Sequence, residues 1–266
     1  MCDICKKHGD GGKWYLNPKN YGRELEEARR EYLERLAGRT LSEYLVGGYE
    51  LGEKLQKTPL IGKLLVALGD KYYGGTMGGQ IVPLQDLLQV LDICQNPSIL
   101  PCECRKLVGE EGYQCLNMGM LPQLYQKANP DEYVEELTLP RAKRLLTEWD
   151  EKGFYHLILW TRLPYVTTVC NCTAPTCTAY KGRRLLGLRN NMLKGEYVAY
   201  VDSERCTGCK ACLTRCPFGA VRFNLDAGKA FVEINNCFGC GLCASGCKPG
   251  AVKLMDRRST PARAIW

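Results

Sequence analysis

Residues 201–224 have the sequence VDSERCTGCKACLTRCPFGAVRFN, and residues 232–255 repeat its pattern as VEINNCFGCGLCASGCKPGAVKLM. The first copy contains Cys206-x2-Cys209-x2-Cys212-x3-Cys216-Pro217. The second contains Cys237-x2-Cys240-x2-Cys243-x3-Cys247, thirty-one positions later. Glycine, alanine and valine residues between and after the cysteines also match. An internal repeat of this kind predicts two copies of one structural unit.

The spacing of these eight cysteines has a chemical explanation. A cubane iron–sulfur cluster needs four thiolates arranged tetrahedrally around a small inorganic core. Three cysteines at x2 spacing can wrap one cluster in a compact loop, and Gly208, Gly239 and Gly241 would allow the backbone to approach the sulfides. Zinc sites and disulfides are the alternatives, but zinc sites rarely use this four-cysteine run twice.

The stretch from about residue 197 to residue 256 resembles a bacterial-type ferredoxin module with two [4Fe-4S] clusters. In such modules the fourth cysteine of each run ligates the other cluster. The resemblance therefore implies one cluster bound by Cys206, Cys209, Cys212 and Cys247, and a second bound by Cys237, Cys240, Cys243 and Cys216. The chain departs from the pattern after Cys247, where Lys248 places a cation beside the cluster.

The length of the chain, 266 residues, leaves room for a larger domain before this module. We expect an α+β fold, with a mostly helical N-terminal and middle part followed by a small pseudo-symmetric ferredoxin-like domain. The expected regions are an N-terminal helical region (1–80), a cysteine-rich helical and strand domain with a candidate additional metal site (81–196), the ferredoxin domain (197–256) and a basic tail (257–266).

Charge and cysteine content limit the classes of function. The formal net charge of +7 overstates the basic character, because each [4Fe-4S] unit with its thiolates carries about −2. Nucleic acid is therefore an unlikely partner. We see no apolar signal sequence and no apolar run of membrane-spanning length. Seventeen cysteines without export signals indicate a reducing cytoplasm, in keeping with an anaerobic setting.

Hydrophobic periodicity and glycine positions predict the remaining elements. We expect a strand at 155–160 and a flexible glycine-rich loop at 74–79. The expected helices cover residues 21–37, 41–55, 59–68, 83–94, 139–152 and 180–193.

A second group of cysteines precedes the ferredoxin module. Its members are Cys102, Cys104, Cys115, Cys170, Cys172 and Cys177. If each Cys-x-Cys is extended, both of its thiolates face one side, and two such pairs can hold a metal centre. A redox dithiol and reduced, buried structural thiols are the alternatives. Arg105 follows Cys104 directly and is either an anion-binding cation near a cluster or an ordinary surface residue.

The N-terminus carries Cys2-x2-Cys5 followed by His8. This pattern is either half of a metal site or a chain terminus with incidental thiols. Neither the role of these two cysteines nor that of Cys94 can be read from the sequence.

The middle of the chain also resembles a set of larger ferredoxin-like proteins of anaerobes. The resemblance rests on Cys102-Glu103-Cys104-Arg105, an intervening helix, and Cys170-Asn171-Cys172 before the two-cluster module. It implies an arrangement of sites but no particular reaction.

Electron transfer is the function that the sequence favours. The chain would pass single electrons through two [4Fe-4S] clusters to or from an additional cysteine-ligated centre or a redox partner protein. One alternative is an iron–sulfur oxidoreductase whose second cysteine group holds a catalytic cluster and binds a small-molecule substrate. The other is a redox-responsive regulator. The oligomeric state is left open.

Overall fold

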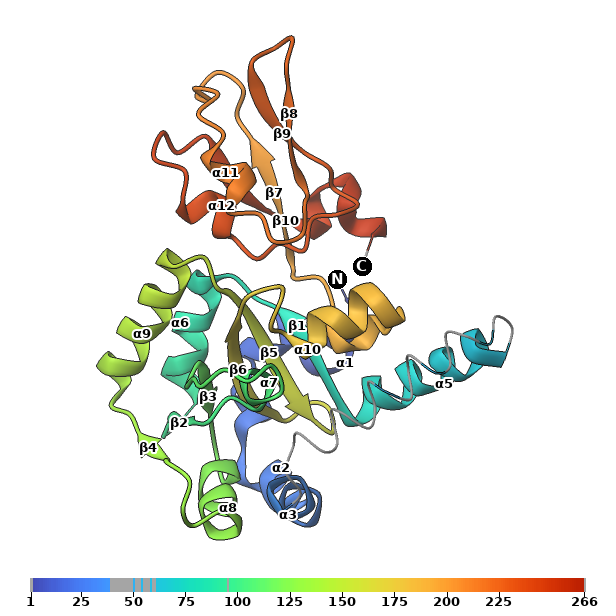
Figure 1. Ribbon diagram of the computed structural model, residues 1–266, viewed down its shortest axis with the longest axis vertical. Coiled ribbons are helices and arrows are strands. Elements are labelled where there is room, and N and C mark those ends of the chain that lie inside the picture. Colours follow the sequence, from blue (N-terminus) through green and yellow to red (C-terminus); the bar gives the residue numbers. More distant parts are fainter. Residues whose placement is uncertain are drawn as a thin grey trace.

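The computed structural model describes residues 2–38, 50, 54, 58, 61–94 and 96–265 of the chain. A helix-covered antiparallel sheet forms one part of the molecule, and a smaller cysteine-rich part sits on one end of it (Figure 1). No helix among these described residues is long and apolar enough to cross a membrane.

Six strands form the central sheet, in the order β1-β5-β6-β3-β2-β4, and every neighbouring pair is antiparallel. Their bounds are β1 Met77–Ile81, β2 Ser98–Leu100, β3 Cys115–Asn117, β4 Glu135–Glu136, β5 Tyr155–Thr161 and β6 Val166–Cys172. β5 and β6 are almost completely buried, because elements pack on both of their faces. The burial fits the mainly apolar sequence of β5, whereas β6 also buries the polar side chains of Thr167, Thr168 and Asn171.

Helices α6 (Leu84–Ile93) and α9 (Leu139–Glu151) lie side by side against the sheet (Figure 1). Leucines at helical spacing, such as Leu87 and Leu91, face the core, and Leu146 of α9 joins them there. Burial of such a leucine side chain contributes about 1.5–3 kcal/mol.

The N-terminal segments share the same core. Trp14 packs edge-on against Trp160 of β5, with 5.6 Å between ring centroids, and its indole N–H donates to Gln80 of β1. The N-terminal elements are α1 Asp3–His8, η1 Trp14–Leu16, η2 Pro18–Tyr21, α2 Arg23–Glu27, α3 Arg30–Gly38 and α5 Ile61–Thr76. The other short helices around the sheet are α7 Glu103–Lys106, α8 Leu121–Ala128, α10 Thr178–Lys181, η3 Gly182–Leu186 and η4 Arg189–Asn191.

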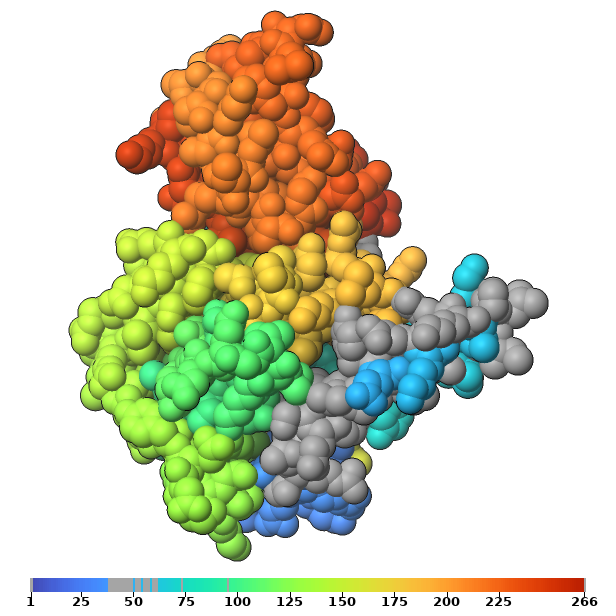
Figure 2. Space-filling view, in the orientation of Figure 1, coloured from blue at the N-terminus to red at the C-terminus, as the bar shows by residue number. Residues whose placement is uncertain are grey.

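The cysteine-rich part consists of two small two-stranded sheets and short helices. Its elements are β7 Tyr197–Val201, α11 Ala211–Thr214, β8 Val221–Asn224, β9 Lys229–Val232, α12 Leu242–Ser245 and β10 Val252–Asp256. β7 pairs with β10 and β8 with β9. Figure 2 shows this part resting on the surface formed by α9 and by the segment that follows β6.

The tail after β10 packs back on the junction between the two parts. It forms η5 (Arg257–Ser259) and η6 (Pro261–Ala264). The guanidinium of Arg257 is fully buried and donates to the carbonyl oxygens of Gly195, Tyr197 and Cys237 at 2.7–3.0 Å. These charge-assisted bonds fix the end of the chain to the start of β7.

The structure confirms the α+β class, the helices at 83–94 and 139–152, and the strand at 155–160. The helix expected at 21–37 is present as α2 and α3, with a break at Ala28 and Arg29. The helix expected at 59–68 corresponds to α5. The helix expected at 41–55 falls almost entirely outside the described residues.

Two expectations were wrong. Residues 74–79 are not a loop, because α5 continues to Thr76 and β1 begins at Met77. The single helix expected at 180–193 is instead the succession of α10, η3 and η4, since Gly187 adopts a φ of +75° that ends the helix. β1 spans residue 80, where we expected the N-terminal helical region to end, and it pairs within the central sheet. The boundaries of the domains stay predictions.

Candidate iron–sulfur sites

The two cysteine runs of the C-terminal part adopt matching backbone conformations. Gly208 and Gly239 occupy equivalent positions with φ of +72° and +74°, and Lys210 and Gly241 are also equivalent, with φ of +64° and +89°. A Cβ atom on Gly239 would lie 2.2 Å from the carbonyl oxygen of Tyr197. This glycine is therefore needed where the cysteine loop crosses β7.

The fourth cysteine of each run lies with the cysteines of the other run. The thiol of Cys212 interacts electrostatically with Cys206 and with Cys247. Cys243 interacts with Cys237 and Cys216, and also with Cys212 of the first run. The two groups share one apolar core, whose members include Val198, Ala220, Val221, Ala251 and Val252. Each fourth cysteine thus lies near cysteines of the other run, while the division of the eight cysteines into two ligand sets stays a prediction.

Burial disfavours ionisation of these thiols in the absence of a cation. It raises the pKa of Cys243 to about 12, with a further contribution from the neighbouring thiol of Cys237. Burial likewise raises the pKa of Cys240 well above its usual range. Thiolates at these positions need positive charge close by, which is what iron ions supply.

The second group of cysteines also meets in space. We call Cys102, Cys104, Cys115, Cys170, Cys172 and Cys177 the six-cysteine cluster. Cys115 of β3 is paired with Cys170 of β6, and their sulfur atoms are 3.7 Å apart. The Sγ of Cys115 is also 3.8 Å from that of Cys102. Cys172 lies two positions further along β6 and interacts with Cys177, the N-cap of α10.

The two Cys-x-Cys stretches reach this cluster by different routes. Cys170 and Cys172 lie on a strand, where residues two apart face the same side. Cys102 instead caps α7, and Cys104 lies within that helix, 3.1 Å from the Oγ1 of Thr178. The expectation that both stretches are extended was therefore wrong for Cys102 and Cys104.

Cys172 and Cys177 form a coupled pair of buried thiols. The hydrogen bond from Cys172 lowers the pKa of Cys177 to about 7, and the nearby Tyr155 hydroxyl acts in the same direction. The pKa of Cys172 is raised in turn, first by this hydrogen bond and then by burial. One thiolate is thus readily formed in this part of the six-cysteine cluster.

An apolar contact region joins the six-cysteine cluster to the C-terminal part. The rings of Phe218 and Phe238 stack with centroids 4.3 Å apart, and Tyr155 lies 5.4 Å from Phe218. Cys172 and Cys177 pack in this region together with other buried residues, among them Cys240 and Met192, and the partly buried Cys216 and Cys170. No feature of the sequence had marked these aromatic residues as part of a site.

A cavity of about 170 Å³ opens onto the other side of the six-cysteine cluster. Its lining is mainly apolar and includes Cys102, Cys104, Cys115 and Cys170. Polar groups enter it from Asn117 and from the threonines of β6. Four of the six thiols therefore face a space that can admit a small molecule.

Arg105 does not present a free charge to this cavity. Its guanidinium is paired with the carboxylate of Glu110 at 2.5 Å, and its side chain is 13% exposed.

Three further cysteines lie outside these groups. The two N-terminal cysteines lie beside Glu196, and Cys94 is buried near the carbonyl oxygen of Leu91.

Comparison with known proteins identifies the C-terminal part. Residues 199–248 match the family model of the 4Fe-4S dicluster domain. The chain is 36% identical over 135 residues to the beta subunit of dimethylsulfide dehydrogenase from Rhodovulum sulfidophilum. The matched stretch covers 46% of this chain and 39% of that protein. It is 33% identical over 67 residues to the beta subunit of chlorate reductase from Ideonella dechloratans. The matched stretch covers 25% of this chain and 19% of that protein.

The chain thus spans about two fifths or less of the length of these relatives. The dicluster match confirms the predicted ferredoxin-like module with two [4Fe-4S] clusters. Together with the similarity to the two beta subunits, it also confirms the predicted class of protein. The chain therefore contains a 4Fe-4S dicluster domain at residues 199–248 and is similar in part to the beta subunits of two oxidoreductases.

Proposed function

We propose that this protein passes single electrons between its two [4Fe-4S] clusters, a third centre at the six-cysteine cluster, and a catalytic partner. One observation carries the proposal. The six cysteines come from separate segments of the chain, and they meet where Cys172 and Cys177 share an apolar region with Cys216 and Cys240 of the dicluster domain.

The crossed arrangement of the eight ferredoxin cysteines supports the ligand sets that the resemblance implies. We assign one cluster to Cys206, Cys209, Cys212 and Cys247, and the other to Cys237, Cys240, Cys243 and Cys216. Under this assignment the second cluster is the one beside the six-cysteine cluster, because both Cys216 and Cys240 reach the shared apolar region.

Charge supports a metal at the six-cysteine cluster. Sulfur atoms 3.7 and 3.8 Å apart in a buried site repel one another strongly as thiolates. Iron ions would remove this repulsion. Pairing of β3 with β6 places the thiols of Cys115 and Cys170 side by side, as two ligands of one metal centre need to be. When bound, such a centre would accept or donate one electron at a time.

Aromatic residues between the two groups of cysteines would assist electron transfer. Tyr155, Phe218 and Phe238 fill the space between the second cluster and the six-cysteine cluster and exclude water from it. A dry, rigid environment lowers the reorganisation of solvent that accompanies a change of charge. It also tunes the potential of each centre through burial.

The relatives suggest the kind of partner. They are named as beta subunits of a dehydrogenase and of a reductase, each of which implies a further subunit. We propose that this chain likewise exchanges electrons with a separate catalytic protein. We also propose a cytoplasmic location, because none of the seventeen cysteines forms a disulfide, a state that a reducing compartment maintains.

The cavity favours a second candidate function. Cys102, Cys104, Cys115 and Cys170 line it, so a centre bound there would be open to a small, mainly apolar molecule. The protein would then itself be an oxidoreductase. A change in the electron paramagnetic resonance (EPR) signal of the third centre on addition of small ligands would favour this function over simple transfer.

Iron analysis tests the main proposal. Two cubanes account for about eight irons per chain, and a third raises the number to about twelve. We expect more than eight irons in anaerobically purified protein. The double substitution Cys170→Ala/Cys172→Ala should lower the number to about eight while both ferredoxin EPR signals remain. Cys94→Ala, which removes a buried thiol outside every site, is the matched control. A wild-type protein with eight irons and no other metal would overturn the proposal.

A further inference from the structure

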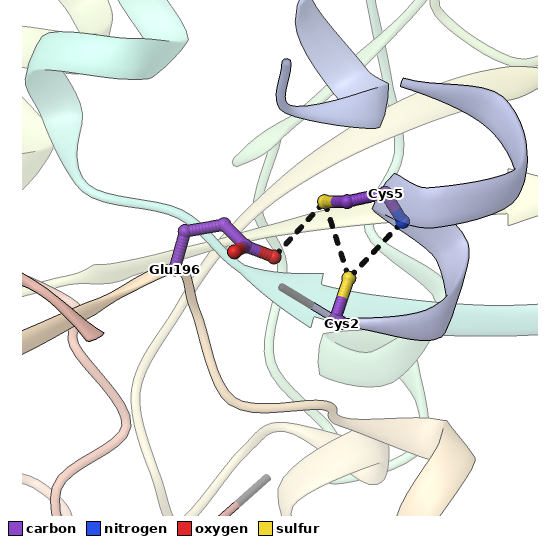
Figure 3. A group of neighbouring side chains, drawn as sticks. All are labelled: Cys2, Cys5 and Glu196. Atoms are coloured by element: carbon purple, nitrogen blue, oxygen red, sulfur yellow. Dashed lines mark hydrogen bonds between the residues drawn. The ribbon is translucent and has the colours of Figure 1, made fainter. Parts of the chain in front are cut away.

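Two cysteines and a glutamate that belong to none of the iron–sulfur sites proposed above meet at the N-terminus (Figure 3). The Sγ atoms of Cys2 and Cys5 are 3.2 Å apart, and the thiol of Cys5 lies 3.1 Å from Oε1 of Glu196. One ligand atom of each residue lies within 4.8 Å of those of the other two. Cys2 is 6% exposed, Cys5 1% and Glu196 2%.

Local structure holds the three side chains in place. Cys2 is the N-cap of α1 and accepts a hydrogen bond from the backbone N–H of Cys5 at 3.3 Å. Glu196 comes from a distant segment, directly before β7. The side-chain amide of Gln80 donates to its Oε1 at 3.2 Å, and the backbone N–H of Arg257 donates to its carbonyl oxygen at 2.8 Å.

We propose that Cys2, Cys5 and Glu196 bind a zinc ion. Two cysteine sulfurs and one carboxylate oxygen form a donor set that Zn²⁺ accepts, and a Cys-x2-Cys pair is the usual spacing for two of its ligands. The sequence had suggested His8 as the companion of these cysteines. The group that the structure brings together contains Glu196 in its place.

Charge balance agrees with a divalent ion. Two thiolates and a carboxylate carry three negative charges, and Zn²⁺ reduces this sum to minus one. The buried guanidinium of Arg257 donates to the carbonyl oxygen of Gly195, the residue before Glu196, at 2.8 Å, and it interacts electrostatically with Glu196. Arg258 also interacts electrostatically with both Cys5 and Glu196. The remaining charge is therefore compensated by this chain.

The proposed site borders a cavity through Cys2. Cys2 forms part of the wall of a cavity of about 820 Å³, which is also lined by basic residues such as Lys6, Lys194 and Arg258. A water molecule from this cavity can complete a tetrahedral site. The ion would join α1 to the junction between β1 and β7.

The test uses the full chain with its iron–sulfur clusters, purified anaerobically. Elemental analysis should find about one zinc per chain. X-ray absorption at the zinc edge should show two sulfur ligands at about 2.3 Å and oxygen ligands at about 2.0–2.2 Å. Glu196→Gln keeps the shape of the side chain, and we expect it to weaken zinc binding at least tenfold in competition with a chelator. Cys5→Ser should abolish binding, and Cys94→Ser, the control, should leave it unchanged.

Iron content provides an independent reading. It should remain at the wild-type value in Glu196→Gln, whatever the number of irons proves to be. This separates the zinc site from the proposed third iron–sulfur centre. The zinc proposal is overturned by a wild-type chain without zinc, by zinc bound through four sulfurs, or by equal affinity in Glu196→Gln and wild type. Anaerobic protein in which Cys2 and Cys5 form a disulfide would overturn it in favour of a redox dithiol.

Discussion

Cys216 ends the first cysteine run, yet its thiol lies among the cysteines of the second run. We predict that Cys216→Ala damages the cluster of Cys237, Cys240 and Cys243 and spares the cluster of Cys206, Cys209 and Cys212. The reason is that one thiolate ligand is lost from the second site alone. EPR spectra of the reduced protein would distinguish the two signals. Loss of only the first-run signal would refute the crossed assignment.

Some site residues could be recognised from the sequence and others could not. The eight cysteines of the dicluster domain were identifiable, because cluster chemistry fixes their type and spacing, whereas the metal-binding role of the other six stays a prediction. Glu196 was not, since its position depends on where the chain enters β7. The sequence also placed Lys248 beside Cys247, and the structure shows its side chain exposed, where salt screens its charge.

Among the helices and strands, the short strands and the glycine-rich strand could not be predicted from the sequence. α6 and α9 carry clear apolar stripes, so periodicity found them. β2, β3 and β4 are only two or three residues long, too short for a periodic signal. The glycines of β1 resemble a loop, but Gly78 faces the indole of Trp160, where an added Cβ would lie 2.3 Å from the ring.

The glycines in the cysteine loops provide a test at the same scale. Gly239→Ala would combine a φ of +74° with a Cβ 2.2 Å from the carbonyl oxygen of Tyr197. We predict that it destabilises the dicluster domain by about 1–3 kcal/mol, so that the visible absorbance of the clusters bleaches at least about fivefold faster in denaturant.

Gly219→Ala is the matched control for this substitution. Gly219 has a φ of +64°, but nothing lies within 4 Å of an added Cβ. We expect only the backbone cost of about 1 kcal/mol there. Equal bleaching rates for the two variants would show that the close approach to β7 has no energetic effect.

At the scale of the whole molecule, the two parts are held together next to their cysteine sites. Arg257 fixes the tail to the start of β7, and Phe218 and Phe238 of the dicluster domain pack toward Tyr155 of the sheet. The order of these parts could be predicted from the sequence, because the cysteine repeat marks the last part of the chain. Their mutual packing could not, since it depends on aromatic and arginine side chains without any distinctive spacing.

Arg215 connects the two parts most directly. Its guanidinium donates to the carbonyl oxygens of Asp150 and Glu151 at the end of α9, at 2.7 and 2.9 Å, and its Nε donates to that of Leu242 at 2.8 Å. We predict that Arg215→Ala costs about 1–3 kcal/mol, because several charge-assisted hydrogen bonds are lost. Arg215 is next to Cys216 in the chain but is not a cluster ligand. Both ferredoxin EPR signals should therefore remain.

Hydrogen exchange on the cluster-loaded protein would measure this loosening. Amides near the end of α9 and in α12 should exchange at least about fivefold faster in Arg215→Ala, since these segments lose their shared contact. Arg141→Ala is the control, because Arg141 lies on α9 itself but pairs on the surface with Glu135. If the two variants exchange alike, Arg215 does not hold the dicluster domain against α9. The proposed electron path would then depend on the aromatic contacts alone.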